Sequence, residues 1–346
     1  ALMRASIASA SNDNRLGSNE APPAILSVFI GKQLTAVLED LENVSKGKLS
    51  PEEKTDLKLN VIGKIPEILL DNTDRNRTSP FAFTGNKFEF RAVGSKSNCA
   101  KSITVLNAAV AQQLEKFGKE VEVLIDKKDM KKDDAIFNAL RDNLKGIKNI
   151  LFEGDGYSEE WKKKAKERGL SYNQNTPQAL TAFVSKKSIA LFEQTKVLSD
   201  REANARYIVD LKEYIMRIQI ESRTLGDIAR NHIIPTGIKY QNILIQNVNG
   251  LKEIYGSDFK KLADVQMKII ERISGHIEEI NKGIFKMVEI RKQLNEIDDE
   301  FLKASAYCDK VLPYLVDIRY HCDKLELVVD DNLWPLAKYR ELLFCR

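Results

Sequence analysis

The sequence predicts an α+β protein that is mostly α, in which short antiparallel strands with helices are followed by a bundle of long helices. Residues 81–83 are apolar, residues 87–91 alternate charged and apolar residues, and Thr84-Gly85-Asn86 lies between them, which is typical of a β-hairpin. From residue 98 onward, nearly every segment repeats its apolar residues at the spacing of an α-helix. A chain of 346 residues is long enough to form about two domains.

The elements before the hairpin are predicted from shorter patterns. Residues 1–10 alternate small and apolar residues and predict a strand. Because this pattern is already under way at Ala1, we expect a truncated chain and not a natural N-terminus. Residues 24–44 place apolar residues at helical spacing and predict a helix. Ser50 followed by Pro51 is a good start for a further helix, with a capping hydroxyl and proline in the first turn.

The part of the chain after the hairpin predicts a series of helices. Their expected ranges are 101–125, 132–147, 158–168, 176–183, 186–194, 200–225, 238–255, 257–304, 306–322 and 334–344. The longest of them carries an apolar residue at every seventh position: Ile273, Ile280, Met287, Leu294 and Phe301. This period indicates a coiled coil or a long bundle. Packing within the same chain is the favoured interpretation, and a contact between subunits is the alternative.

Composition and charge exclude several classes of function. The net charge of +4 is small for this length and gives no support to nucleic-acid binding. The longest apolar run has about ten residues, which is too short to span a membrane. The cysteines follow no metal-binding or redox spacing, and they are expected to be free thiols in the cytoplasm: Cys99, Cys308, Cys322 and Cys345. The histidines lie far apart in the sequence and are expected to be structural: His232, His276 and His321.

The hairpin carries the chemistry that a function requires. Lys87, Glu89 and Arg91 alternate with Phe88 and Phe90, so the three charges share one face of the second strand. An arginine grips phosphate or carboxylate oxygens in a bidentate manner, and a glutamate is a hard ligand for Mg²⁺. The face therefore suits a magnesium-bound phosphate. The alternative is an ordinary solvated face, because charged outer faces are common in antiparallel sheets.

Four separated stretches then resemble one family, the glutamine synthetases, in their long bacterial type III form. They are Arg15-Leu16-Gly17 with Asn19-Glu20-Ala21-Pro22-Pro23, the stretch from Asn76-Arg77 to Glu89-Phe90-Arg91, Asn231-His232-Ile233-Ile234-Pro235-Thr236, and Trp334-Pro335-Leu336-Ala337-Lys338-Tyr339. The four stretches occur in the expected order, and the resemblance covers essentially the whole chain. The resemblance implies that residues 1–222 are the C-terminal portion of the catalytic domain. Residues 223–346 would then be a helical C-terminal domain.

The resemblance also implies an activity, the joining of glutamate and ammonia with ATP through a γ-glutamyl phosphate. Mg²⁺ or Mn²⁺ would be the cofactor, and ATP the co-substrate. The implied catalytic residues are Glu20, which takes a proton from ammonium, and Arg77, which steadies the transferred phosphoryl group. The implied binding residues are Arg15 and Arg91 for the substrate, Lys87 for the nucleotide and Glu89 for the metal.

Departures from the family pattern leave alternatives open. Many relatives have an arginine at the position of Ala82, so its role is lost here or taken by another residue, such as Arg75. Further metal ligands are expected before Ala1, and we expect no catalysis by this chain alone. The resemblance implies a homo-oligomer of stacked rings, a dodecamer. The competing interpretations are a helical scaffold without catalysis, and a related ligase that joins glutamate to an amine.

Overall fold

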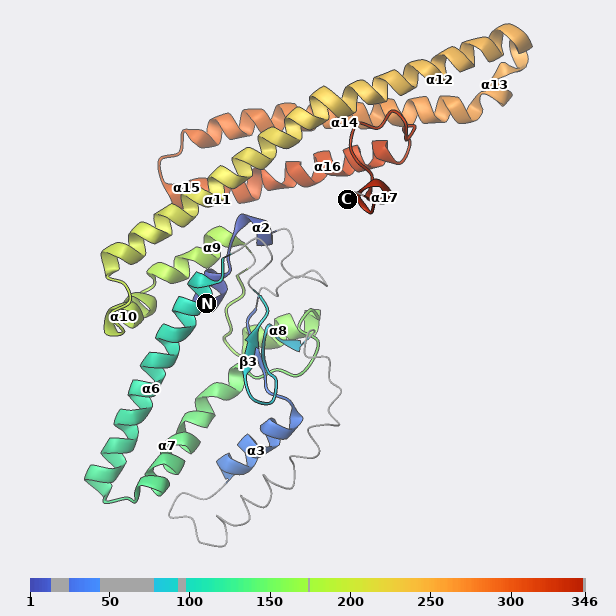
Figure 1. Ribbon diagram of the computed structural model, residues 1–346. Coiled ribbons are helices and arrows are strands. Elements are labelled where there is room, and N and C mark those ends of the chain that lie inside the picture. Colours follow the sequence, from blue (N-terminus) through green and yellow to red (C-terminus); the bar gives the residue numbers. More distant parts are fainter. Residues whose placement is uncertain (14–24, 44–77, 93–97, 174, 345–346) are drawn as a thin grey trace. The chain divides into compact units, whose positions relative to one another are not determined.

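The structure, a computed structural model, describes residues 1–13, 25–43, 78–92, 98–173 and 175–344 (Figure 1). The chain divides into two compact units, Ala1–Asp210 and Leu211–Arg346. A small sheet and several helices form the first unit, and the described part of the second unit is helical. The mainly helical α+β fold class is thus confirmed. Helix α11 (Asp200–Ile228) runs through the division between the units, and the domain boundary expected after residue 222 stays a prediction.

The sheet has three short strands in the order β1 (Val28–Phe29), β2 (Phe81–Phe83) and β3 (Phe88–Phe90). β1 is parallel to β2, and β2 is antiparallel to β3. The turn between β2 and β3 is closed by the amide of Thr84, which donates to the carbonyl oxygen of Lys87 at 2.8 Å. Gly85 in this turn has φ +97°, a conformation that a Cβ would disfavour. The hairpin predicted from the sequence is therefore confirmed.

Two predictions near the N-terminus are wrong. Residues 1–10 do not form a strand, because α1 (Leu2–Ser6) and the start of α2 (Ala10–Asp13) lie there. Their small residues pack closely on neighbouring helices: the Ser6 and Ser102 hydroxyls are 3.0 Å apart. The helix predicted over residues 24–44 begins only with α3 (Lys32–Asn43). Burial alternates from Ile25 to Phe29, which is the period of an extended chain and not that of a helix.

The other helices of the first unit surround small apolar clusters. α6 (Ala100–Lys128) and α7 (Lys132–Ile147) form an antiparallel pair, which is held by a core of Val121, Ala135 and Ala139. The shorter elements that follow are η2 (Lys148–Ile150), α8 (Glu159–Glu167), α9 (Thr176–Leu180), η3 (Thr181–Val184) and α10 (Lys186–Gln194). Three of these helices start at side-chain caps, namely Ser158, Asn175 and Ser185. These elements confirm the helices predicted between residues 101 and 194.

The second unit is built from long helices that pack along one another. After α11, the π-helical turn η4 (Ala229–Ile233) leads into α12 (Ile234–Tyr255). The chain continues through η5 (Gly256–Asp258), α13 (Phe259–Leu262), α14 (Asp264–Asn295), α15 (Glu300–Lys310), α16 (Leu312–Glu326) and α17 (Tyr339–Leu342). In Figure 1, α12 and α14 form a long antiparallel pair and α16 lies beside α14.

The predicted seven-residue seam lies inside this unit. Ile273, Ile280, Met287 and Leu294 of α14 are almost completely buried within the single chain. The intramolecular interpretation of the seam is thus confirmed. The single helix predicted over residues 257–304 is wrong in its extent, since the chain breaks after Asn295 and α15 starts anew behind Asp299. Among the described residues, no helix is both long enough and apolar enough to cross a membrane.

Candidate functional site

The candidate site lies on the hairpin of β2 and β3. Residues that lie opposite one another in an antiparallel pair share a face, and the register pairs Ala82 with Glu89. The other two pairs are formed by phenylalanines, which line the opposite face: Phe81, Phe83, Phe88 and Phe90. Their rings stack or tilt against one another, with centroids 5.2–5.9 Å apart. The predicted separation of aromatic and charged faces is therefore correct.

Neither face of the hairpin is uniformly buried or uniformly exposed. Phe88 on the aromatic face is 49% exposed, whereas Ala82 on the charged face is completely buried. The side chains of Glu89 and Arg91 are only 29% and 28% exposed. The Glu89–Arg91 pair is therefore accessible to water and could be reached by a ligand from solvent. Lys87 lies at the end of the turn and is exposed.

Glu89 and Arg91 form a charge-assisted pair on this face. The Nε of Arg91 donates to Oε2 of Glu89 at 2.8 Å, and its Nη2 donates to the same oxygen. The backbone amide of Arg91 donates to the carbonyl oxygen of Pro80 at 2.8 Å, which ties the end of β3 to the start of β2. The pair therefore fixes the orientation of both side chains relative to the sheet.

The other predicted site residues lie outside the described residues. These are Arg15, Glu20 and Arg77, and the substitute arginine Arg75 also lies there. Of the predicted constellation, the structure brings together Glu89 and Arg91, with Lys87 at the turn. The described residues contain no group of three or more histidine, cysteine, aspartate or glutamate side chains arranged to hold a metal ion. A hard divalent cation takes six or more oxygen ligands, so Glu89 would supply one ligand among several.

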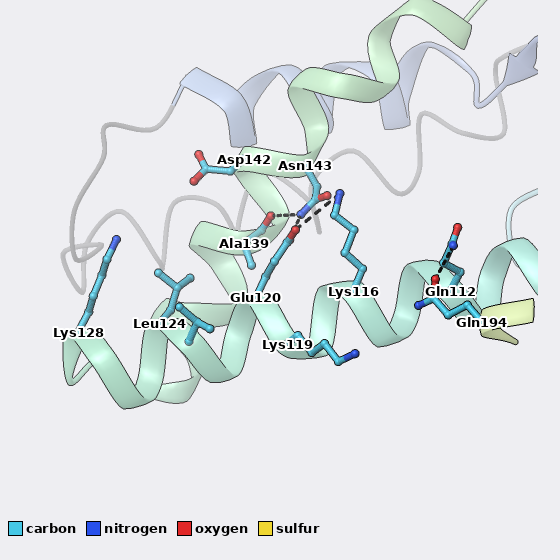
Figure 2. A pocket seen from close by; sticks show the side chains of 11 residues that line it. Gln112, Lys116, Lys119, Glu120, Leu124, Lys128, Ala139, Asp142, Asn143 and Gln194 are labelled. Atoms are coloured by element: carbon cyan, nitrogen blue, oxygen red, sulfur yellow. Dashed lines mark hydrogen bonds and ion pairs between the residues drawn. The ribbon is translucent and has the colours of Figure 1, made fainter. Parts of the chain in front are cut away.

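A groove between α6 and α7 has a volume of about 980 Å³, and none of the predicted site residues that the structure describes lines it (Figure 2). Nζ of Lys116 lies 3.7 Å from Oε1 of Glu120, one turn further along α6. Asn143 donates to the same glutamate at 2.7 Å, and Gln112 donates to Gln194 at 2.8 Å. Several polar groups of the groove thus satisfy one another, and its lining mixes lysines with acidic residues.

Sequence reasoning missed one pair of residues. His276 on α14 and His321 on α16 were expected to be far apart, yet their Nδ1 atoms are 2.9 Å apart. The 45 positions between them give no local signal, because the pairing depends on the register of two helices in the bundle. The cysteine prediction is confirmed where the structure describes it, since Cys99, Cys308 and Cys322 form no disulfide bond.

Comparisons with known proteins agree with the family resemblance of the sequence. Residues 135–252 match the family model described as the glutamine synthetase C-terminal domain. Over the whole chain, the sequence is 48% identical to a glutamine synthetase of Bacteroides fragilis (strain YCH46) and 37% identical to a type-3 glutamine synthetase of Dictyostelium discoideum. A glutamine synthetase of Butyrivibrio fibrisolvens is 32% identical over 99% of the chain.

The chain therefore belongs to the glutamine synthetase family. One of its relatives carries the type-3 name, in agreement with the resemblance to the long type III form. The chain spans about half the length of these relatives, 47%, 46% and 47% respectively.

Proposed function

We propose that this chain is part of a ligase that forms glutamine from glutamate and ammonia with ATP, through a γ-glutamyl phosphate. The observation that supports this proposal is the pairing of Glu89 and Arg91 on one face of the hairpin. It occurs in a chain that resembles glutamine synthetases along its entire length. A helix bundle that serves only assembly has no need of a carboxylate and a guanidinium held together on a partly buried strand.

Glu89 and Arg91 have complementary roles in this proposal. Glu89 supplies one carboxylate ligand to Mg²⁺ or Mn²⁺, which neutralises the oxygens of the ATP phosphates when it is bound. Arg91 holds the substrate glutamate or its acyl phosphate, since a guanidinium presents two parallel donors to such oxygens. The hydrogen bonds to Glu89 restrict the rotamers of Arg91, so that less conformational entropy is lost when the substrate arrives.

Ala82 supports this assignment of Arg91. Many relatives have an arginine at that position, and Ala82 lies directly opposite Glu89 in the sheet. An arginine there would point to the same face as Glu89. In this chain, Arg91 donates to that carboxylate. We therefore assign to Arg91 the electrostatic role that the missing arginine would have beside Glu89.

The remaining predicted residues complete the chemistry. An oxygen of the substrate γ-carboxylate attacks the terminal phosphorus of ATP, and ADP leaves. Ammonia then attacks the carbonyl carbon of the acyl phosphate, and inorganic phosphate leaves. Arg77 would stabilise the charge that develops on the transferred phosphoryl group. Glu20 would remove a proton from ammonium, Arg15 would hold the substrate carboxylate, and Lys87 would contact the nucleotide.

The proposal includes the assembly and location of the protein. A homo-oligomer of stacked rings, a dodecamer, follows from the family resemblance, and the active site would then be completed by a neighbouring subunit. Free cysteines in the described part of the chain agree with a cytoplasmic location.

The test is an assay of the complete gene product for glutamine and phosphate formation that requires glutamate, ammonium and ATP. Arg91→Met and Glu89→Gln should each lower turnover by about two to three orders of magnitude, as expected for the loss of a group that stabilises developing charge. Glu213→Gln is a matched control, because Glu213 forms an exposed ion pair with Arg217 on α11. It should leave turnover unchanged. Normal turnover in Arg91→Met and Glu89→Gln would remove the proposed roles, and an assembled wild-type protein without ligase activity would favour the scaffold.

A further inference from the structure

Two imidazole rings meet between α14 and α16. His276 comes from α14 and His321 from α16, and their Nδ1 atoms are 2.9 Å apart. The ring centroids are 5.2 Å apart, and the ring planes are inclined by 53°. Both side chains are partly accessible to water, since the side chain of His321 is 17% exposed. Two imidazole nitrogens thus lie side by side between α14 and α16, where water can reach them.

The surroundings of His276 and His321 indicate which of their ring nitrogens carry a proton. At 2.9 Å, one Nδ1 donates a hydrogen bond and the other accepts it. Oδ1 of Asp317 lies 3.8 Å from Nε2 of His321, which favours the tautomer of His321 that carries its proton on Nε2. Nδ1 of His321 then has a free lone pair and accepts from Nδ1–H of His276. His276 needs only to move its proton to Nε2 to present a second free lone pair.

We propose that His276 and His321 bind one divalent transition-metal ion, of the Cu²⁺ or Ni²⁺ class, between α14 and α16. Imidazole nitrogens suit these metals, and metal–nitrogen distances near 2.0–2.1 Å are usual. Two such bonds to nitrogens separated by 2.9 Å enclose an angle of about 90° at the metal. This is the angle between neighbouring ligands in the square or tetragonal geometry that Cu²⁺ and Ni²⁺ prefer. A tetrahedral zinc site would require nitrogens about 3.3 Å apart.

The groups around the two histidines determine the affinity of the site for a metal ion. Burial, and then the charges of His321, Arg272 and Lys324, lower the pKa of His276, so its imidazole is neutral near pH 7 and able to coordinate. The positive charges of Arg272 and Lys324 also repel a metal ion. The carboxylate of Asp317 beside His321 partly offsets this repulsion. Cys322 is adjacent in sequence, but burial raises the pKa of its thiol to about 12, so it remains protonated. Water completes the coordination.

A metal ion bound by both histidines would cross-link α14 and α16. An ion held by one residue of each helix binds the folded state and not the unfolded chain, so it raises the free energy of unfolding by mass action. Because the site lies in the bundle and uses none of the residues proposed for the ligase, its occupancy can be measured without any activity assay.

The experiment titrates the metal-free, untagged 346-residue chain with NiCl₂ and with CuCl₂ near pH 7.5. Isothermal calorimetry should give one saturable site, and thermal unfolding should shift to higher temperature with each metal. Electron paramagnetic resonance of the Cu²⁺ form should show coupling to two nitrogens. Asp317→Asn should weaken binding about tenfold, because it removes the carboxylate that orients His321.

Three histidine variants decide the proposal. His276→Gln and His321→Gln should each lose the saturable site and the thermal shift while keeping the circular dichroism of the wild type. His232→Gln is the matched control, since His232 lies exposed on η4, and it should bind as the wild type does. Binding that persists in the first two variants, an equal loss in His232→Gln, or no saturable site in the wild type would each overturn the proposal. None of these outcomes would affect the proposed ligase function.

Discussion

Gly283 lies directly against Ile318, and the space between them does not admit a methyl group. A Cβ added to Gly283 would be 2.9 Å from Cγ1 of Ile318, a side chain that is completely buried. This contact brings α14 and α16 closer together than any larger residue would allow. His276 lies seven residues before Gly283 and His321 three residues after Ile318, so the same close approach lets the two imidazoles meet.

Gly283→Ala should destabilise the chain although alanine favours helices. The exchange gains about 1 kcal/mol of helix propensity. It also forces Ile318 or the helix backbone to move, and overpacking of a core costs about 1–3 kcal/mol. We therefore expect a net loss, measured as a lower midpoint of urea unfolding.

Gly275→Ala is the matched control for this prediction. Gly275 lies on the same helix, and a Cβ there would meet nothing within 4 Å. The control should therefore show only the propensity gain of up to about 1 kcal/mol. If Gly283→Ala were as stable as Gly275→Ala, the close contact between the helices would be wrong.

Stability should fall as the pH drops through the range in which His276 titrates. Its pKa is lowered in the folded chain, first by burial and then by His321, Arg272 and Lys324. Below the ordinary value of about 6.5, the unfolded chain binds more protons than the folded one, so the free energy of unfolding rises with pH there. The stabilising contribution is fully present above the unfolded pKa and is lost as pH falls through the folded value. At low pH, a protonated His276 would also be repelled by the cations Arg272 and Lys324.

The measurement compares urea unfolding at pH 7.5 and pH 5.0, in the presence of a chelator, for the wild type and His276→Gln. The difference between the two proteins removes the contribution of all other carboxylates and histidines that they share. The wild type should lose more stability than the variant on acidification. Identical losses would show that the protonation of His276 is not linked to folding.

The elements that the sequence predicted correctly have local signals. The hairpin follows from the alternation of residues 88–91 and from the glycine turn, and the α14 seam follows from its seven-residue period. The strand prediction for residues 1–10 failed because small residues such as alanine and serine are compatible with a strand and also pack well in short helices. The break before α15 had a signal, since Asp299 is a capping residue whose Oδ1 accepts from the amide of Leu302 at 2.7 Å. The seven-residue period continued through it to Phe301 and concealed it.

Only part of the candidate site could be predicted from the sequence, and the reason is physical. The face shared by Glu89 and Arg91 follows from strand periodicity alone. The burial of Ala82 on that face does not, because it depends on what packs against the sheet. The meeting of His276 and His321 depends on a helix register that spans 45 residues. Local patterns fix directions within one element, whereas contacts between elements need the assembled core.

Ser158→Ala should destabilise the first unit by about 1 kcal/mol. The hydroxyl of Ser158 accepts a hydrogen bond from the amide of Trp161 at 3.1 Å and caps α8. The helix buries Trp161, whose ring stacks on Phe152 with centroids 3.7 Å apart, so loss of the cap loosens a packed aromatic pair. Ser158→Asp should retain the stability, because aspartate caps equally well. Unfolding followed by tryptophan fluorescence provides the measurement, and equal stability of the Ala and Asp variants would contradict the role of the cap.

Tyr307 tests how a buried polar triangle contributes to the helix bundle. Its ring is completely buried, and its hydroxyl donates to Oδ1 of Asn295 at 2.7 Å while it accepts from Nε2 of Gln219 at 2.8 Å. Gln219 also donates directly to Asn295 at 2.8 Å, so these two side chains keep a partner when the hydroxyl is removed. Tyr307→Phe should therefore cost only about 1 kcal/mol, the net value of an ordinary hydrogen bond. Tyr307→Ala should cost about 3–5 kcal/mol, because it also leaves a cavity between α11, α14 and α15. Urea unfolding of both variants measures the ratio of the two costs. A cost of Tyr307→Phe that approaches that of Tyr307→Ala would mean that the hydroxyl, and not the buried ring, holds the three helices together.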